Sequence, residues 1–267
     1  MDLLIITPTL GNSPWLKETI NSVEKLRLTS RHVLVAPDPK IGELRVRYPA
    51  CKVIADTGRG MYEAINTGIA SVDNWDAFTY INDDDILLDG FRAAYLEMAD
   101  VLDTPAIIYG GVQLINTEGQ RIGRVPVAPK GNLNRALYEQ GIESVYQQGT
   151  LTNRIALEKI GLYDTSLRYC GDTEWFARAA LLDTPFIKSN GNDVAAFRIR
   201  PGQLSKDNSS LARERALIDH KLKLRVARLQ WRHTYARFVF RASNLSVYLD
   251  RLLKYGWVTN REVNNRG

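Results

Sequence analysis

The stretch AFTYINDDDILL, residues 77–88, decides the class of the fold. Its first part, Ala77 to Ile81, is an apolar run typical of a buried strand, and it leads directly into Asn82-Asp83-Asp84-Asp85. Adjacent carboxylates repel one another, and a hard divalent cation with oxygen ligands relieves this repulsion. Open α/β sheets bind ligands at the carboxyl ends of their strands, so the cluster predicts a Mg2+ or Mn2+ site that also takes substrate phosphates. The alternative is a solvated turn in which Asp85 caps the following helix.

The sequence around this stretch alternates apolar strands with amphipathic helical patterns. Before it, strands are predicted at 3–7, 32–36 and 52–55, and helices at 16–26 and 60–70. Beyond it, helices and strands are predicted at 90–102, 106–115, 120–127, 133–140, 147–152, 155–160, 173–182, 186–189 and 194–199. This alternation predicts an α/β fold with a largely parallel central sheet and flanking helices.

Polar residues also follow the other early strands. Thr7-Pro8-Thr9 ends the first strand and can present backbone and hydroxyl groups to a nucleotide, while Asp38 and Asp56 follow the second and third strands. A single aspartate of this kind is ordinary turn chemistry. Carboxylates after three strands that share one sheet edge indicate a binding site.

Two further motifs offer candidate functional groups. Gly58-Arg59-Gly60 lacks the third glycine of the dinucleotide fingerprint and does not follow the first strand, so it predicts either a plain turn or a loop that brings Arg59 to a phosphate or base. Asp172 precedes a helical pattern, and the residues alone favour a helix N-cap over a general base. A positioned base accelerates a reaction by roughly 10²–10⁴-fold.

Charge is distributed unevenly along the 267 residues. The net charge of +5 divides into −4 for residues 1–205 and +9 for residues 206–267, where residues 209–255 predict a long, basic, amphipathic helix. Such a tail fits nucleic acid, an anionic membrane or an acidic partner. Its broad apolar stripe favours packing against the body or a second subunit, and contact with a membrane stays open beside that.

Other classes of protein are not expected from this composition. No apolar run reaches the roughly 18 residues of a membrane-spanning helix, and no basic region precedes the apolar amino terminus, so neither a spanning helix nor a signal peptide is predicted. The 2 cysteines and 3 histidines have no metal-ligand spacing, which disfavours a zinc site and favours a reducing compartment. We therefore expect a cytoplasmic protein, with peripheral membrane contact as a further possibility.

Four motifs in fixed order resemble the GT-A glycosyltransferases of family 2, an inverting group that includes many bacterial polysaccharide enzymes. They are IITPTLGNSPWLKETINSV (5–23), DTGRGMYEAINTG (56–68), YINDDDILL (80–88) and IGLYDTSLRYCGDTEWFAR (160–178). The resemblance covers residues 3–205. It implies a Rossmann-like GT-A domain at 1–205, with a nucleotide-sugar half (1–110) and an acceptor half (111–205), followed by a basic helical extension at 206–267.

The resemblance also implies roles for single residues. Asp172 would be the catalytic base, and Asp85 would ligate the Mn2+ or Mg2+ that bridges the diphosphate. The nucleotide-sugar pocket would include Pro8, Thr9, Asp38, Asp56, Arg59, Asp83 and Asp84, with Asp38, Asp56 and Arg59 toward the base and Asp84 near the ribose. Arg200 stands near a position where the family often has a histidine, and would meet phosphate. Gly171 replaces a usual glutamate.

The resemblance implies metal-dependent, inverting transfer of one sugar from a nucleotide-diphosphate sugar, most often a UDP-sugar. The acceptor would be a hydroxyl of a glycan or lipid-linked molecule in bacterial surface polysaccharide synthesis. Polymer extrusion is not expected, because the Gln-x-x-Arg-Trp motif of processive synthases is absent. The alternatives are a sugar-phosphate nucleotidyltransferase and an inactive binding or scaffold subunit. No nucleic-acid reading motif accompanies the basic tail, so nucleic acid is not an expected partner, whereas self-association through the tail is.

Overall fold

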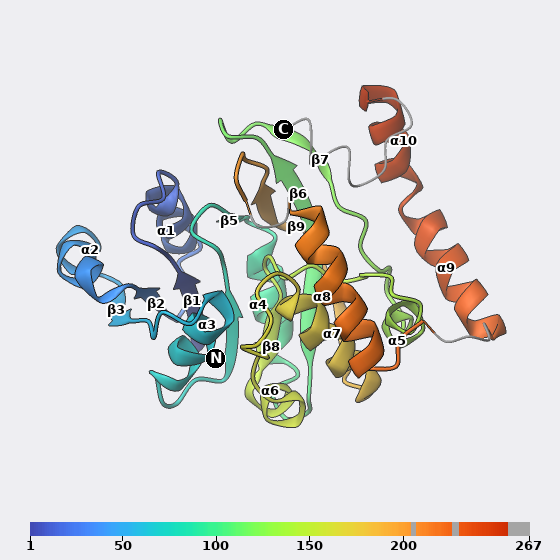
Figure 1. The fold of residues 1–267 in the computed structure, drawn as a ribbon, viewed down its shortest axis with the longest axis horizontal. Coiled ribbons are helices and arrows are strands. Elements are labelled where there is room, and N and C mark those ends of the chain that lie inside the picture. The colour runs from blue at the N-terminus through green and yellow to red at the C-terminus, as the bar shows by residue number, and fades with distance from the viewer. Residues whose placement is uncertain (204–206, 226–229, 256–267) are drawn as a thin grey trace.

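The computed structural model describes residues 1–203, 207–225 and 230–255 of the chain, and the predicted domain boundary between 205 and 206 lies outside them. Within these residues one sheet of nine strands runs through the molecule in the order β3-β2-β1-β4-β8-β6-β9-β5, with β7 beside β6 (Figure 1). The strands are β1 (Leu3–Pro8), β2 (Ser30–Ala36), β3 (Lys52–Ala55), β4 (Ala77–Tyr80), β5 (Ile86–Leu87), β6 (Ile107–Ile115), β7 (Arg121–Arg124), β8 (Leu151–Asn153) and β9 (Phe186–Arg198).

The first four strands form the parallel half of the sheet. Ile6 of β1 lies opposite Val33 of β2 and Tyr80 of β4, and β3 pairs with β2 in the same direction. Most residues of β1, β2 and β4 are buried because helices cover both faces of the sheet, whereas β3 at the sheet edge is partly exposed. Their carboxyl ends meet at one edge, where the polar residues noted in the sequence follow.

The second half of the sheet mixes strand directions. β8 is antiparallel to both β4 and β6, whereas β6 and β9 are parallel over a long register. The sequence predicted separate strands at 186–189 and 194–199, but β9 is continuous. Register shifts beside Gly111 accommodate the extra residues between its two apolar parts. The predicted α/β class is confirmed, and the parallel pattern is concentrated in the first half.

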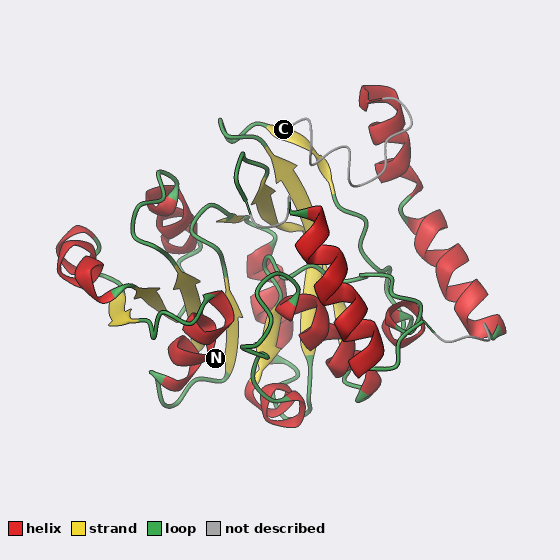
Figure 2. Ribbon diagram, viewed as in Figure 1, coloured by secondary structure: helices red, strands yellow, loops and turns green. Residues whose placement is uncertain are grey.

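Helices flank the sheet on both sides (Figure 2). They are α1 (Leu16–Lys25), α2 (Ile41–Arg47), α3 (Met61–Ala70), α4 (Phe91–Ala99), α5 (Asn134–Tyr138), α6 (Arg154–Ile160), α7 (Gly171–Leu181), α8 (Asn208–Lys221), α9 (Trp231–Ser243) and α10 (Leu245–Tyr255). None of the helices in the described ranges is long and apolar enough to cross a membrane.

The basic tail forms three helices in place of the single long one expected from the sequence. Lys223 and Arg225 adopt the left-handed backbone conformation just after α8, with φ of 52° and 56°. The second break lies at Asn244, directly after α9. The Asn244 side chain forms hydrogen bonds with the backbone N–H and carbonyl of Val127. Neither break involves proline or glycine, so the periodicity of the sequence does not reveal them.

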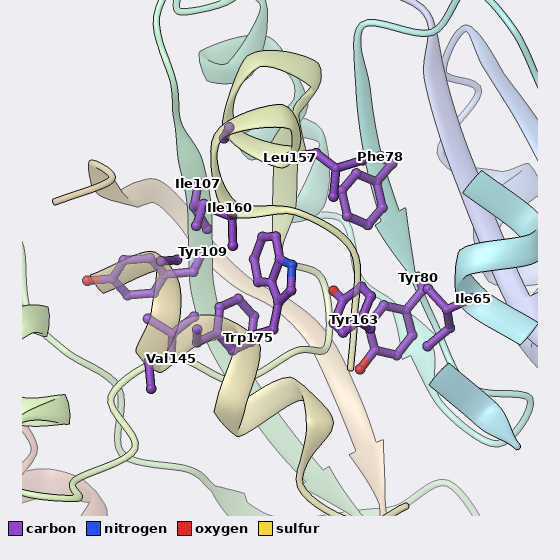
Figure 3. Packing of buried hydrophobic residues seen from close by; sticks show 14 of the residues in the cluster. Ile65, Phe78, Tyr80, Ile107, Tyr109, Val145, Leu157, Ile160, Tyr163 and Trp175 are labelled. Atoms are coloured by element: carbon purple, nitrogen blue, oxygen red, sulfur yellow. The ribbon is translucent and has the colours of Figure 1, made fainter. Parts of the chain in front are cut away.

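A buried aromatic cluster joins α7 to the sheet (Figure 3). Trp175 is fully buried, stacks on Tyr163 at 5.3 Å between ring centroids, and meets Phe78 of β4 edge-on at 6.5 Å. The Trp175 indole N–H donates to the Gly161 carbonyl at 2.8 Å, which satisfies its only polar atom. This packing fixes α7, and with it Asp172 in its first turn, relative to the end of β4.

Candidate functional site

The acidic loop, residues 82–85, lies at the carboxyl edge of the parallel half. Ile81, the residue before it, donates its N–H to the Ile6 carbonyl at 2.9 Å, so the loop leaves the sheet beside the end of β1. The Thr9 hydroxyl donates to Asp83 at 2.5 Å, and the Ser13 hydroxyl donates to the Asp83 carbonyl at 2.8 Å. The structure thus brings together Thr9 and the acidic cluster, which are 74 positions apart in the sequence.

Asp85 is the most buried carboxylate of this loop, with a relative exposure of 1%. One of its oxygens accepts the Arg198 backbone N–H at 2.9 Å, and the other accepts the side-chain amides of Asn82 and Gln148, both at 3.3 Å. Burial raises the pKa of Asp85 well above its usual range, and the charge of Asp84 adds to this effect.

Two arginines of the segment at the end of β9 neutralise the acidic loop. Arg200 forms an ion pair with the Asp84 carboxylate. Arg198 is buried, donates through Nε to the Asp84 carbonyl at 2.8 Å, and pairs with Glu18 of α1 at 2.6 Å. Both guanidinium groups lie within 6 Å of the Trp15 ring centroid. Arg200 is therefore held beside the acidic loop, as a phosphate-binding residue would need to be.

The side chains of the acidic loop match the chemistry of a hard cation. All of them offer oxygen, and among the described residues the Asn82 Oδ1 atom is buried without a hydrogen-bond partner. No group of three or more His, Cys, Asp or Glu side chains in the described ranges could hold a metal by itself. A cation here would therefore need phosphate or water oxygens to complete its coordination, which is the usual pattern for Mg2+. On this chemistry the residues fit a divalent cation bound together with a diphosphate.

Asp172 lies in the first turn of α7. Its Oδ1 accepts the Thr173 backbone N–H at 2.8 Å and the Tyr62 hydroxyl at 3.2 Å. The pKa of Asp172 is raised to about 6, first by burial and then by the charge of Glu143, while these two hydrogen bonds oppose the rise. A carboxylate with this pKa is ionised at neutral pH yet basic enough to accept a proton.

Tyr80, at the end of β4, connects the two acidic groups. Its pKa is raised well above the ordinary value, first by burial, then by the charge of Asp172 and, more weakly, by that of Asp85. The Tyr80 ring meets Tyr163 edge-on at 5.6 Å between ring centroids, and Tyr163 stacks on Tyr62, which donates to Asp172. These contacts connect the segment that carries Asp172 to the end of β4, from which the acidic loop continues.

The structure explains why glycine occupies position 171, directly before Asp172. A Cβ atom built there would lie 2.6 Å from the ring of Tyr62, closer than side chains approach one another. Glutamate, which the family usually has at this position, cannot be accommodated while Tyr62 donates to Asp172. In this chain the tyrosine ring occupies the space of that side chain.

The remaining predicted residues lie around the same edge of the sheet. Asp56 follows β3 and accepts the Gly58 N–H at 2.9 Å, while Asp38 is exposed at the start of a short 3₁₀ turn. Arg59 is 71% exposed and pairs with Glu63 at 3.0 Å. Pro8 ends β1 opposite Val35. Among the described residues, no hydrogen bond or ion pair links Asp38 or Arg59 to the acidic loop, so their roles stay predictions.

The structure adds site residues that the sequence did not single out. Arg198 anchors the acidic loop, Tyr62 and Glu143 set the environment of Asp172, and Gln148 bonds Asp85. Tyr62 lies within a motif that carried the resemblance, and this was the one available signal. The others contact the site across long sequence separations and have no motif of their own.

Comparison with known proteins identifies the fold. No protein-family model and no curated protein matches the chain. Among solved structures, S. aureus TarS superposes with a TM-score of 0.59 at 12% identity over 96% of this chain, which spans 44% of the TarS chain. TarS 1–349 in complex with UDP-GlcNAc gives a TM-score of 0.61 at 12% identity, covering 96% of this chain and 78% of that one.

A second glycosyltransferase matches as well. The mannosyltransferase PcManGT from Pyrobaculum calidifontis, solved with GDP-Man and Mn2+, gives a TM-score of 0.56 at 13% identity, covering 98% of this chain and 84% of that one. At such identities these matches establish the fold alone. The chain has the GT-A-like fold of these glycosyltransferases, which confirms the predicted architecture.

Proposed function

We propose that this chain is an inverting glycosyltransferase of the family 2 type that moves one sugar from a nucleotide-diphosphate sugar to an acceptor hydroxyl. The observation that carries the proposal is the packing that joins Asp172 to the end of β4: Tyr62 donates to Asp172 and stacks on Tyr163, which meets Tyr80 two residues before the acidic loop. One group can accept a proton and the other lies where ligands bind in open α/β sheets.

The donor lies along the ends of β1 to β4. Thr9 and Asp83 face the nucleotide, with Asp38, Asp56 and Arg59 toward the base and Asp84 toward the ribose. UDP is the expected carrier. TarS and PcManGT were solved with UDP-GlcNAc and with GDP-Man, so the fold accepts more than one base in those proteins.

Asp172 accepts the proton of the acceptor hydroxyl as that oxygen attacks the anomeric carbon from the face opposite the diphosphate. The anomeric configuration therefore inverts. Arg200 turns toward the leaving diphosphate, where its charge is worth most in the transition state. Asp85 and its neighbours in the acidic loop would hold a Mn2+ or Mg2+ ion, which when bound would neutralise charge on the leaving diphosphate.

The acceptor is a glycan or a lipid-linked molecule, and the C-terminal helices bring the enzyme to an anionic membrane. Trp231, Tyr235 and Phe238 are 79%, 54% and 69% exposed on one face of α9, while the opposite face is buried against the body. α10 also carries exposed leucines: Leu245, Leu249, Leu252 and Leu253. A tail with a net charge of +9 favours anionic lipid over a second, equally basic copy.

The Asp172→Asn variant tests the proposed chemistry. Asparagine keeps the size of the side chain but accepts no proton, so we expect transfer to fall by roughly 10²–10⁴-fold while the dissociation constant of the donor stays near that of the wild type. The measurement is transfer from UDP-sugars to a hydroxyl acceptor with Mn2+, together with donor binding by calorimetry. Wild-type turnover in the variant would refute the assignment of the base.

A matched control uses the same chemical change elsewhere. Asp103 is exposed on the loop before β6, and no hydrogen bond or ion pair in the described part of the chain links it to the site. Asp103→Asn should therefore transfer as the wild type does. Formation of a nucleotide sugar from a sugar phosphate and a nucleoside triphosphate would instead identify the chain as a nucleotidyltransferase.

A further inference from the structure

Helix α8 belongs to the basic tail in the sequence but contacts the segment that carries Asp172 (Figure 1). The Glu214 carboxylate accepts the backbone N–H groups of Arg168, Tyr169 and Cys170 at 2.7, 2.8 and 2.8 Å. These residues form the pre-base loop, residues 168–170, which ends directly before α7. One side chain of α8 thus satisfies every N–H donor of this loop.

Two further contacts join α8 to the same segment. Arg215 donates to Glu143 at 2.6 Å, and the same Glu143 oxygen accepts the Thr173 hydroxyl at 2.9 Å. Lys221 bridges Asp164 at 2.7 Å and Glu174 at 3.0 Å. Glu174 is fully buried, and burying a charge is costly unless it is paired. The contacts of α8 therefore lie on both sides of Asp172 along the chain.

The position of Asp172 depends on these supports. Its own carboxylate contacts only Thr173 and Tyr62 among the hydrogen bonds of the described residues. The backbone that carries it is fixed from one side by the Tyr62 ring against Gly171 and from the other by Glu214 through the pre-base loop. A carboxylate attracts the N–H groups at the start of a helix, and its charge also suits the positive end of the helix dipole.

We infer that Glu214 is a positioning residue for the catalytic base, and that α8 is part of the catalytic unit. This inference rests on the proposed function, because it takes Asp172 as the base. Removing the charge of Glu214 releases the pre-base loop and lets Asp172 leave the line of attack on the acceptor hydroxyl. Donor binding, which takes place at the ends of β1 to β4, does not depend on this contact.

Glu214→Gln in the full chain tests the inference. Glutamine keeps one acceptor oxygen but turns an NH2 group toward N–H donors, so the loop loses part of its support. We expect kcat to fall by about 10- to 100-fold, the cost of a small misplacement of a reacting group, with the donor dissociation constant and the melting temperature near those of the wild type. Glu158→Gln, the same change at an exposed position of α6, is the control and should leave kcat unchanged.

A double variant separates positioning from a general structural role. If Glu214 acts through Asp172, Glu214→Gln adds no further loss of transfer in the Asp172→Asn background. A loss that adds fully in that background, or a kcat equal to that of Glu158→Gln, would overturn the inference.

Amide hydrogen exchange tests the support of the pre-base loop without an activity measurement. Glu214→Gln should speed the exchange of the residue 168–170 amides and leave those of β1 and β4 unchanged. Unchanged exchange of the pre-base loop would overturn the inference whatever the kinetics. Wild-type transfer by Asp172→Asn would instead refute the proposed function, and the exchange rates alone would then decide whether Glu214 holds the loop.

Discussion

The carboxylate of Asp172 has a pKa of about 6 because burial disfavours its charged form and Glu143 adds a like charge. A general base works only when ionised, so activity is present above this pKa and is lost as the pH falls through it. We expect the transfer rate of the wild type to have an acidic limb centred near pH 6, measured with a donor concentration well above KM. A limb near the ordinary aspartate pKa of 3.8 would contradict the raised pKa of Asp172.

Two variants should move this limb in opposite directions. Tyr62→Phe keeps the ring but removes a hydrogen bond to the charged form of Asp172, so the pKa rises and the limb moves to higher pH by up to about one unit. Glu143→Gln removes the nearby negative charge, so the pKa falls and the limb moves to lower pH. The test is the pH dependence of kcat for both variants, and shifts of the same sign would contradict this account of Asp172.

At the residue scale, the sequence reveals the groups that carry charge but not the groups that orient them. Asp83 to Asp85 and Asp172 stand out because adjacent carboxylates and a helix-start aspartate are visible as patterns. The partners of these groups lie far along the chain: Arg198 is 114 positions from Asp84, and Glu214 is 44 positions from Cys170. Such contacts arise from the tertiary fold, and no local spacing encodes them.

At the scale of elements, the early strands were predicted to within two residues because their signal is local. β1, β2 and β4 are short and largely buried, β3 is a short and partly exposed strand at the sheet edge, and each ends at a polar turn. The tail was predicted as one helix because its apolar stripe continues through the break after α8. There the chain turns at two residues with positive φ, Lys223 and Arg225, which form no sequence signal. Periodicity reports which face is buried, and it does not report where a helix ends without proline or glycine.

The exposed apolar face of α9 gives a prediction at the same scale. We expect the full chain to float with vesicles that contain phosphatidylglycerol and not with vesicles of phosphatidylcholine alone. Replacing Trp231 and Phe238 by serine removes two large exposed side chains, and binding should weaken on the order of 10-fold or more.

The control for this experiment is Val46→Ser, at a position 85% exposed on α2. It should bind vesicles as the wild type does. If the double variant instead loses only self-association, as measured by light scattering, the apolar face binds a second copy and the membrane proposal is wrong.

At the scale of the whole molecule, the tail serves two parts of the structure. α8 contacts the segment around Asp172, whereas α9 packs against α5 through His233, which bonds the buried Glu139 at 2.9 Å. α10 follows Asn244, whose side chain holds the backbone of Val127. The basic tail, residues 206–267 with a net charge of +9, is therefore one continuous stretch of sequence whose helices pack against two different parts of the protein.

This division predicts different results for two truncations. A chain that ends after residue 225 retains α8, so we expect it to transfer sugar to a water-soluble acceptor. Its melting temperature should be lower, because Glu139 loses its contact with His233 and Val127 loses its contacts with Asn244. A chain that ends after residue 207 also loses Glu214 and Lys221, which leaves the pre-base loop unsupported and the buried Glu174 with one partner fewer. It should lose most of its transfer activity even at temperatures where it is folded and still binds donor.

Circular dichroism and calorimetric titration with UDP check the folding and the donor binding of both truncated chains. Equal activity of the two truncated chains would place the end of the catalytic unit before α8.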